Sequence, residues 1–344
     1  MKLIDQLNIP KEKVIRKKPI NLGKKDFKLF SNEIEKILPA VSAKLISKCF
    51  IMPNGKLLER LFLNNDQFNI SPNYRIRLKT YIYTFFSITQ IRKISNFDNM
   101  IFITNTNSHN FFHWCLDVLQ KLEMIDKKLN NAIKKKYSIL IPYGHNSSFI
   151  KQTLNIFNLK FYEQDKNELI FLKKIVLLPD ISPTGNYRKD LICNLRHRLQ
   201  KYFSSKLNSF KKKRIFISRS SNKNRKIINE NQIYPILIEK GFLILDFDLL
   251  SFNEQLGYII NCEILISSHG AGLTHMTWMQ ERSKVLEIRE KDDQQNNCYF
   301  TLASDLGHEY HYSFMKKINL TKNSKIILYK VDSINFKKKL LLML

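Results

Sequence analysis

Short apolar runs alternate with stretches of helical periodicity along the second half of the chain. Strands are predicted where the runs are rich in β-branched and aromatic residues, at Arg214–Ser218, Phe242–Phe247, Ile264–Ser267, Lys284–Ile288 and Glu309–Phe314. Helices are predicted in the intervening stretches, at Glu230–Lys240, Phe252–Cys262, Leu273–Met279 and Asn297–Leu306. Alternation of this kind is typical of a parallel, Rossmann-like sheet, which binds ligands at the carboxyl ends of its strands.

The first half of the chain alternates less regularly. Strands are predicted at Met100–Thr104 and Ser138–Ile141, and helices at His109–Ile125 and Ser148–Asn158, which indicates a second α/β layer. The stretch Pro179–Gly185 contains two prolines and a glycine and is predicted to be a linker. We therefore expect an N-terminal domain over residues 1–184 and a C-terminal domain over residues 185–344, each large enough for its own core.

A glycine-rich turn, Ser267–Thr274, follows the apolar run Ile264–Ile266 and leads into a predicted helix. Because Gly270 and Gly272 lack Cβ atoms, the backbone can approach a ligand closely, and the first N–H groups of the helix point toward it. A strand-to-helix turn of this kind favours phosphate binding. An ordinary tight turn in an α/β domain is the alternative.

Two further segments bear on this choice. Arg219 follows the predicted strand Arg214–Ser218, and Arg225 lies six residues further on. A guanidinium makes forked, charge-assisted hydrogen bonds to phosphate oxygens, so the two arginines suit a diphosphate. Glu287 lies inside the apolar run Lys284–Ile288, where a carboxylate must find donors such as ribose hydroxyls. The alternatives are exposed arginines in a basic chain and a glutamate on the solvent face of an edge strand.

A second group of polar residues occurs in the first half of the chain. His109, His113 and Asp117 recur every four residues and are expected on one side of the predicted helix. Such a group can bind a metal or transfer a proton, so a metal-dependent hydrolase is one alternative function. The spacing is not H-E-x-x-H, however, because Asn110 and Phe111 stand where that motif needs glutamate. A purely structural role, in which these side chains cap or bridge helices, is the other alternative.

Together these residues resemble glycosyltransferase family 61 over roughly residues 100–290. The resemblance rests on the order of the motifs Asn110–Asp117, Ser218-Arg219, Arg225, Asn229-Glu230, Ser251–Gln255, His269–Thr274 and Val285–Ile288. It implies a GT-B fold, in which two Rossmann-like domains face a cleft, and inverting, metal-independent transfer from a nucleotide sugar. Bacterial members of this kind often build capsule or lipopolysaccharide, so surface polysaccharide synthesis is the expected setting.

The resemblance and the residue chemistry together define the expected site. Asp117 is the first choice for the base that takes the proton of the acceptor hydroxyl, and His113 is the second. His109 and Trp114 are expected on the acceptor side. The expected donor-binding residues are Arg219, Arg225, Asn229, His269, Gly270, Ala271, Gly272, Leu273, Thr274 and Glu287. No cofactor or metal is expected, because arginines and helix N–H groups would offset the charge of a UDP-linked donor.

Two alternatives remain beside this prediction. Asp246-Phe247-Asp248 has the D-x-D spacing that could hold Mg²⁺ or Mn²⁺ against a diphosphate. We expect a strand-end loop instead, because the triplet lies between two motifs of the metal-independent family. A catalytically inactive GT-B protein that binds glycan or an anionic polymer is also possible, but the chain retains the charged residues of the expected site.

Charge and composition add limits on partners and location. The chain has 57 Lys and Arg against 30 Asp and Glu, a formal charge of +27, which favours anionic partners. Nucleic acid is not expected, because the basic runs at 134–136 and 211–214 lack interleaved aromatic residues. The five cysteines form no C-x-x-C pair, which indicates a reducing compartment. With no signal peptide or spanning helix predicted, we expect a cytoplasmic protein. The tail Phe336–Leu344 either docks on an anionic membrane or folds back onto the protein.

Overall fold

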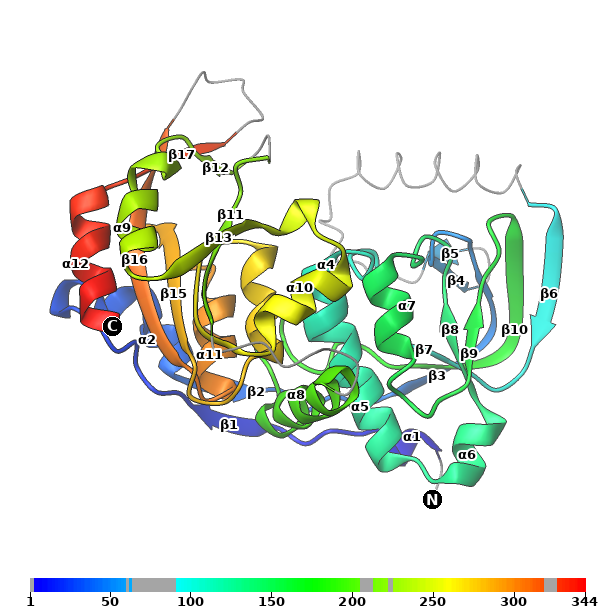
Figure 1. The fold of residues 1–344 in the computed structure, drawn as a ribbon. Helices are drawn as coiled ribbons and strands as arrows, with labels where there is room; N and C mark the ends of the chain where they lie inside the picture. The colour runs from blue at the N-terminus through cyan, green and yellow to red at the C-terminus, as the bar shows by residue number, and fades with distance from the viewer. Residues whose placement is uncertain (1–2, 60–61, 64–90, 205–212, 222–224, 319–326) are drawn as a thin grey trace. The chain divides into compact units, whose positions relative to one another are not determined.

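The computed structural model describes residues 3–59, 62–63, 91–204, 213–221, 225–318 and 327–344 (Figure 1). The chain divides into two compact units. Unit 1 comprises Met1–Lys11 and Pro39–Ser182, and unit 2 comprises Glu12–Leu38 and Pro183–Leu344. The change from unit 1 to unit 2 at Ser182 and Pro183 falls inside the stretch Pro179–Gly185. The segment Glu12–Leu38, which the sequence analysis assigned to the N-terminal domain, groups with unit 2.

Unit 1 is built on a mixed sheet with the strand order β5-β4-β3-β10-β7-β8-β9. Its strands are β3 (Lys44–Ile51), β4 (Leu57–Glu59), β5 (Phe62–Leu63), β6 (Lys93–Phe97), β7 (Met100–Phe102), β8 (Ser138–Ile141), β9 (Phe161–Glu163) and β10 (Glu168–Leu177). Strands β10, β7, β8 and β9 run parallel, whereas β3 is antiparallel to β10. Their carboxyl ends therefore share one edge of the sheet. The α-helices among the described residues of this unit are α1 (Leu3–Gln6), α4 (Phe111–His113), α5 (Leu119–Lys128), α6 (Asn131–Lys136) and α7 (Ser148–Leu154).

The helix predicted at His109–Ile125 begins two residues later and is not uniform. Asn110 has an extended backbone, and its side chain accepts a hydrogen bond from the backbone N–H of Phe112, so it caps helix α4. His109 consequently lies before the helix, and its predicted place on the helix face was wrong. A π-helical turn, Trp114–Val118, joins α4 to α5. Such turns are rare in proteins overall, and those that do form are often found at functional sites.

Unit 2 contains a largely parallel sheet with the strand order β12-β17-β16-β15-β14-β11-β13. Its strands are β11 (Lys213–Ser218), β12 (Lys226–Ile227), β13 (Phe242–Asp246), β14 (Cys262–Ser268), β15 (Lys284–Glu290), β16 (Glu309–Ile318) and β17 (Leu328–Val331). Strands β13, β11, β14, β15 and β16 are parallel, and β17 returns antiparallel to β16. The predicted alternation of strands and helices is therefore confirmed as an α/β fold whose two large sheets contain mostly parallel strands in unit 2 and both parallel and antiparallel strands in unit 1.

Helices cover both faces of this sheet. The α-helices formed after the linker are α8 (Lys189–Ser204), α9 (Tyr234–Glu239), α10 (Phe252–Ile259), α11 (Cys298–Asp305) and α12 (Ser333–Met343). The capping box predicted at Ser251 and Glu254 is present at the start of α10. The stretch predicted as a helix at Leu273–Met279 forms a 3₁₀-helix, Ala271–Trp278. Gly272 and the β-branched Thr274 and Thr277 lower its α-helical propensity.

The C-terminal tail folds back onto unit 2. Phe336, Leu340 and Met343 of α12 are buried in the same apolar cluster as Leu237 of α9 and Ile266 of β14, so α9 and α12 lie on one face of the sheet (Figure 1). Of the two alternatives for this tail, the structure shows the packed helix. None of the helices in the described part of the chain has the length and apolarity that crossing a bilayer requires.

The segment Glu12–Leu38 adds a strand pair and a helix to unit 2. Strands β1 (Glu12–Ile15) and β2 (Glu35–Leu38) pair antiparallel and flank helix α2 (Phe27–Ile34). Arg16, which is buried, forms a two-pronged ion pair with Asp305 of α11, with Nε–Oδ1 and Nη2–Oδ2 distances of 2.9 and 3.0 Å. Phe30 of α2 is fully buried against Phe300 and Tyr312. The segment is therefore part of the core of unit 2.

Candidate active site

His113 and Asp117 form a hydrogen-bonded pair in unit 1. The Nδ1 atom of His113 lies 2.8 Å from Oδ2 of Asp117. His113 ends α4, and Asp117 lies in the π-helical turn, where the backbone N–H of Leu119 bonds to the carbonyl of Trp114. The helix follows β7, so its first turns lie near the edge where the parallel strands end. The structure thus brings together the two residues that the sequence analysis proposed for proton transfer.

The two members of this pair differ in exposure. The Asp117 side chain is 8 % exposed, whereas that of His113 is 24 % exposed. Burial raises the pKa of Asp117 above its ordinary value, the hydrogen bond from His113 opposes this, and the nearby charges of Asp180 and Lys121 raise and lower it respectively. Because Asp117 accepts from Nδ1, the Nε2 atom of His113 is left to face other groups. The arrangement matches an imidazole base that is oriented by a buried carboxylate.

The neighbours of this pair are mostly structural. Trp114 is fully buried, and its indole N–H donates to the hydroxyl of Thr153 on α7 at 2.8 Å, which ties the helices together. His109 is exposed in the turn before α4. The acceptor contacts expected of His109 and Trp114 stay predictions, and for Trp114 the described geometry offers no exposed surface.

Sequence reasoning missed another histidine at this edge. His145 follows β8 and is buried, and burial lowers its pKa to about 4. Its Nδ1 lies 3.1 Å from the carbonyl of Pro142, so Nδ1 carries the proton and Nε2 is an acceptor. That Nε2 atom is buried and has no hydrogen-bond partner among the described residues. The only signal in the sequence was a histidine placed shortly after a predicted strand.

The glycine turn in unit 2 holds an arginine against its backbone. Gly270 has φ +157° and ψ 176° and caps the 3₁₀-helix Ala271–Trp278. A Cβ atom at Gly270 would lie 2.3 Å from Nη1 of Arg219, which follows β11. Glycine therefore allows the guanidinium to approach the turn, at the carboxyl ends of the adjacent parallel strands β11 and β14. The structure brings these two sequence-predicted features together.

The other residues of this turn contribute through their backbone. Leu273 and Thr274 are fully buried, so their side chains face the core of unit 2. At Gly272 a Cβ atom would lie 3.3 Å from Cγ2 of Ile217, which shows that strand and helix pack closely there. The first N–H groups of a helix have no partner within the helix, so Ala271 and Gly272 offer donors at this end.

His269 is oriented by a buried carboxylate. Its Nδ1 lies 2.5 Å from Oε1 of Glu287, and the hydroxyl of Tyr310 donates to Oε2 of the same carboxylate. Glu287 is fully buried, and burial opposes its ionisation. The charge and hydrogen bond of His269, the charge of Arg289 and the hydrogen bond of Tyr310 outweigh burial and hold the pKa of Glu287 below its ordinary value. The ribose contact expected of Glu287 stays a prediction, whereas the structure shows a contact of Glu287 with His269.

Arg219, Arg225 and Asn229, which are also expected on the donor side, differ in their exposure and in their contacts. Burial lowers the pKa of the Arg219 guanidinium, and the nearby charges of Asp248 and Arg225 raise and lower it respectively. Arg225 is exposed with φ +58°. Asn229 is buried, and its amide exchanges hydrogen bonds with the backbone of Val331, with distances of 2.8 and 3.0 Å. Asn229 thus anchors β17, and its expected donor contact stays a prediction.

The D-x-D triplet acts as a loop and helix cap. Oδ1 of Asp246 accepts a hydrogen bond from the backbone N–H of Asp248 at 3.1 Å, and Oδ2 accepts one from that of Ser221 at 3.0 Å. Within the described ranges, no group of three or more His, Cys, Asp or Glu side chains is arranged to hold a metal ion. The strand-end loop expected here is what the structure shows.

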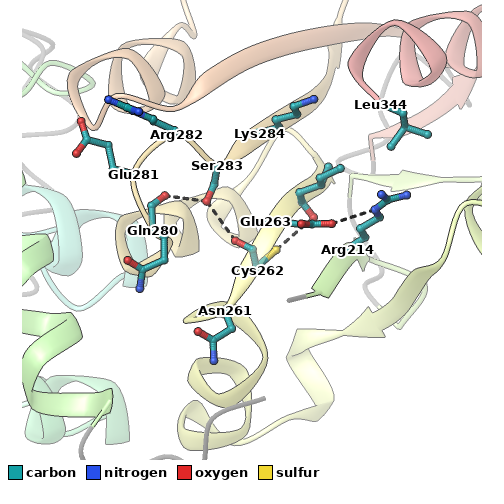
Figure 2. A pocket seen from close by; sticks show the side chains of 11 residues that line it. Arg214, Asn261, Cys262, Glu263, Gln280, Glu281, Arg282, Ser283, Lys284 and Leu344 are labelled. Atoms are coloured by element: carbon teal, nitrogen blue, oxygen red, sulfur yellow. Dashed lines mark hydrogen bonds and ion pairs between the residues drawn. The ribbon is translucent and has the colours of Figure 1, made fainter. Parts of the chain in front are cut away.

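A pocket of about 430 Å³ lies at the other end of the sheet in unit 2. It opens at the amino ends of β11, β14 and β15, and Figure 2 shows the ion pair of Arg214 with Glu263 (3.1 Å) and the contact of Ser283 with Gln280 beside it. None of the sequence-predicted site residues lines this pocket. Parallel sheets bind ligands at the carboxyl ends of their strands, so the glycine turn is the stronger candidate.

Comparisons with known proteins agree with the sequence motifs. The model of the family described as Glycosyltransferase 61 matches residues 111–286, just over half of the 344 residues. The EGF domain-specific O-linked N-acetylglucosamine transferase of Gallus gallus is 34% identical over 111 residues, which cover 31% of this chain and 20% of that protein. The enzyme of the same name from Drosophila melanogaster is 32% identical over 98 residues, 28% of this chain and 18% of that protein.

The matched segment therefore spans about a fifth of the length of these curated relatives. The family-model match over residues 111–286 includes both the His113–Asp117 pair and the Gly270–Arg219 turn, although the two lie in different units. On the match over more than half of its length, the chain belongs to glycosyltransferase family 61.

Proposed function

We propose that this protein is an inverting, metal-independent glycosyltransferase with a GT-B fold, which moves a sugar from a nucleotide-linked donor to a glycan acceptor. The observation that carries this proposal is the approach of Arg219 to Gly270 at the carboxyl ends of β11 and β14. A guanidinium and the N–H groups of a helix start converge there, and both bind phosphate oxygens. Family membership supports the same reaction class.

Unit 2 would bind the donor. Arg219 and the N–H groups of Ala271 and Gly272 would offset the negative charge that develops on the nucleoside diphosphate as it leaves. His269 would present its Nε2 atom to the same group, because Nδ1 is held by Glu287. Arg225 would add a more distant positive charge. These contacts supply the electrostatic stabilisation that a metal ion supplies in other transferases.

Unit 1 would activate the acceptor. In the proposed step, Nε2 of His113 takes the proton of the acceptor hydroxyl while its oxygen bonds to the anomeric carbon and the bond to the diphosphate breaks. Asp117 would orient the imidazole and stabilise its charged form. The exposure of His113 and the burial of Asp117 support this order of roles, which reverses the first choice made from sequence.

We also propose a donor sugar, an acceptor and a cellular location for this reaction. A UDP-linked donor is the first to test, with N-acetylglucosamine as the sugar, because the curated relatives are named for transfer of that sugar. The proposed acceptor is a glycan or glycolipid in bacterial surface polysaccharide synthesis, such as capsule or lipopolysaccharide. The proposed location is the cytoplasm, with peripheral contact between this basic protein and the anionic inner face of the plasma membrane.

Thermal unfolding with nucleoside diphosphates tests the donor site. A ligand at about 100 times its Kd should raise the free energy of unfolding by about 2.7 kcal/mol. The Arg219→Ala variant should lose about 1.5–3 kcal/mol of diphosphate binding, the usual contribution of hydrogen bonds to charged groups, with little change in nucleoside binding. Arg214→Ala is the matched control, because Arg214 is the second residue of β11 and lies at the end of this strand opposite to Arg219.

Chelation separates this proposal from the metal-dependent alternatives. Binding and sugar transfer should persist in EDTA and should not need Mn²⁺. If chelation abolishes turnover and a divalent ion restores it, the metal-independent reading is wrong, and the D-x-D triplet or a hydrolase built on the His113 helix becomes the better explanation. Equal loss of nucleoside and nucleoside diphosphate binding in Arg219→Ala would assign this arginine to folding instead.

A further inference from the structure

Lys121 is a buried cation one helical turn after Asp117. Its side chain is 2 % exposed. The Nζ atom donates to the carbonyl oxygens of Ile103 at 2.7 Å and Leu178 at 3.4 Å, and it pairs with Oδ1 of Asp180 at 2.7 Å. An ammonium group has three N–H donors, so these three contacts use all of them.

The partners of Lys121 connect the helix to the sheet edge. Ile103 follows β7 and Leu178 follows β10, and the two strands are parallel neighbours. The ammonium therefore fastens the carboxyl ends of both strands to the helix that carries the His113–Asp117 pair. An ammonium is costly to bury unless carbonyl oxygens and an anion surround it, so the contacts form as a set.

The charged groups that face Asp117 come from two elements. His113 and Lys121 lie on its own helix, and Asp180 lies in the loop after β10. Lys121 favours the ionised carboxylate of Asp117, and Asp180 disfavours it. Lys121 and Asp180 form an ion pair with each other and thus shift the pKa of Asp117 in opposite directions.

We propose that Lys121 and Asp180 form a positioning pair, which holds the His113–Asp117 pair at the sheet edge and sets its charge state for proton transfer. The inference rests on the proposed function for the link to turnover, and on the buried contacts of Lys121 together with the charges that act on Asp117 for the link to Asp117. Neither residue touches the acceptor in this scheme. Each acts through Asp117.

The surroundings of Asp180 allow its charge to be removed with little loss of packing. A cavity of about 60 Å³ lies beside it and is lined by Thr104, Lys121 and Asp180 among others. The Thr104 hydroxyl is buried and has no hydrogen-bond partner among the described residues, and the cavity is large enough for a water molecule that could bond to it. The Asp180 side chain is 38 % exposed, so an asparagine fits at this position.

Opposite charge changes test the pair. Lys121→Met removes a cation and should shift the Asp117 titration, followed by NMR of carboxyl-labelled aspartate, to higher pH by about one unit. Asp180→Asn removes an anion and should shift it to lower pH. The acidic limb of the kcat/KM profile should move in the same two directions. The double variant should return both readouts toward the wild type, because the two charges are removed together.

Controls separate charge from folding. Lys127→Met removes an exposed cation from the same helix and should leave both readouts in place. If Lys121→Met does not fold, Asp180→Asn alone still decides, because a shift to lower pH supports the pair. The proposal is overturned if the Asp117 titration stays fixed in Asp180→Asn, or if both single variants shift it in the same direction.

The outcome can also be told apart from failure of the proposed function. His113→Gln and Asp117→Asn first establish whether turnover depends on these residues. If the titration of Asp117 moves as expected while turnover is independent of both, the charge-setting pair stands and the assignment of the base is wrong. If turnover depends on both but its pH profile ignores Lys121 and Asp180, the pair has no role in proton transfer.

Discussion

At the scale of single residues, each unit contains an imidazole that is held at Nδ1 by a buried carboxylate. His113 is held by Asp117 and His269 by Glu287. The two carboxylates differ in their surroundings. Burial dominates at Asp117 and raises its pKa, whereas donors and positive charges overcome burial at Glu287 and lower its pKa. The surroundings of Asp117 suit a carboxyl group that takes part in proton transfer, whereas those of Glu287 keep its carboxylate ionised.

The ionised form of Glu287 should make unfolding pH-dependent. A carboxylate with a lowered pKa in the folded state contributes stability above its unfolded pKa, and this is lost as the pH falls through the folded value. Glu287→Gln should therefore lower the free energy of unfolding by about 3 kcal/mol at pH 7, as expected for a broken buried pair, and the difference should shrink below about pH 4. Denaturant unfolding at several pH values measures this.

Glu290→Gln is the control on the same strand. Glu290 is only partly buried and accepts one hydrogen bond, from the hydroxyl of Tyr329 at 3.2 Å. Its substitution should change the free energy of unfolding by about 1 kcal/mol or less. A difference between Glu287→Gln and the wild type that stays constant from pH 7 to pH 3.5 would mean that Glu287 is neutral in the folded protein.

Some of these residues could be found from sequence and others could not. His113, Asp117, Arg219 and Gly270 stand in short motifs, and their chemistry follows from local spacing. Tyr310 reaches Glu287 across 23 positions, and Asp180 pairs with Lys121 from a different element. Such contacts depend on how the strands pair, which local periodicity does not specify. Of Tyr310, Asp180 and Lys121, Lys121 is the one that a sequence pattern could have indicated, because it continues the four-residue spacing of His113 and Asp117.

At the scale of elements, the turn after β14 is the feature that depends most on backbone conformation. Gly270→Ala would bring a Cβ atom to 2.3 Å from Nη1 of Arg219, in a backbone conformation that other residues rarely adopt. The guanidinium must move away. We expect a loss of nucleoside diphosphate affinity comparable with that of Arg219→Ala, about 1.5–3 kcal/mol, measurable by calorimetric titration.

Gly144→Ala serves as the comparison for this turn. Gly144 also has a positive φ, +96°, but a Cβ atom there meets nothing within 4 Å. This variant should lose about 1–3 kcal/mol of folding stability through backbone strain and keep its affinity for the diphosphate. Unchanged affinity in Gly270→Ala would show that the position of Arg219 does not depend on the turn.

The type of most elements was predictable, but two local geometries were not. Apolar runs placed the parallel strands β11, β13, β14, β15 and β16 to within a few residues, because parallel strands are buried on both faces. The short strands β1, β2, β12 and β17 were not predicted. The 3₁₀-helix Ala271–Trp278 and the π-helical turn Trp114–Val118 keep the periodicity of a helix in outline. Their hydrogen-bond patterns are set by packing and by neighbouring caps, which sequence spacing alone does not distinguish from an α-helix.

At the scale of the whole chain, unit 2 is completed by residues from both ends. Phe30 of α2 is fully buried, and the guanidinium of Arg289 lies 4.8 Å from the centre of its ring. Phe30→Ala should lower the free energy of unfolding by about 3–5 kcal/mol, the usual cost of removing a buried aromatic side chain. Phe27→Ala on the same helix, where the side chain is 44% exposed, should cost about 1 kcal/mol or less.

Equal effects of the two substitutions, measured by denaturant unfolding, would mean that Glu12–Leu38 does not belong to the core of unit 2. The boundary predicted between residues 184 and 185 rests on the prolines and the glycine of Pro179–Gly185. The place of Glu12–Leu38 in unit 2 could not be predicted, because Arg16 and its partner Asp305 are 289 positions apart. No pattern within either segment specifies a contact at that separation.

Because residues 12–38 belong to unit 2, the order in which the chain is synthesised on the ribosome affects its folding. The residues of this segment emerge about 270–290 residues before their partners Phe300, Asp305 and Tyr312. At about 5–20 residues per second, translation separates the two events by roughly 14–58 seconds. During that interval unit 1, whose residues precede and follow the segment in the sequence, can fold. The apolar face of α2 remains without its partner for the same time. Slower translation lengthens that exposure, which makes the yield of folded protein sensitive to elongation rate and to chaperones that cover short apolar helices.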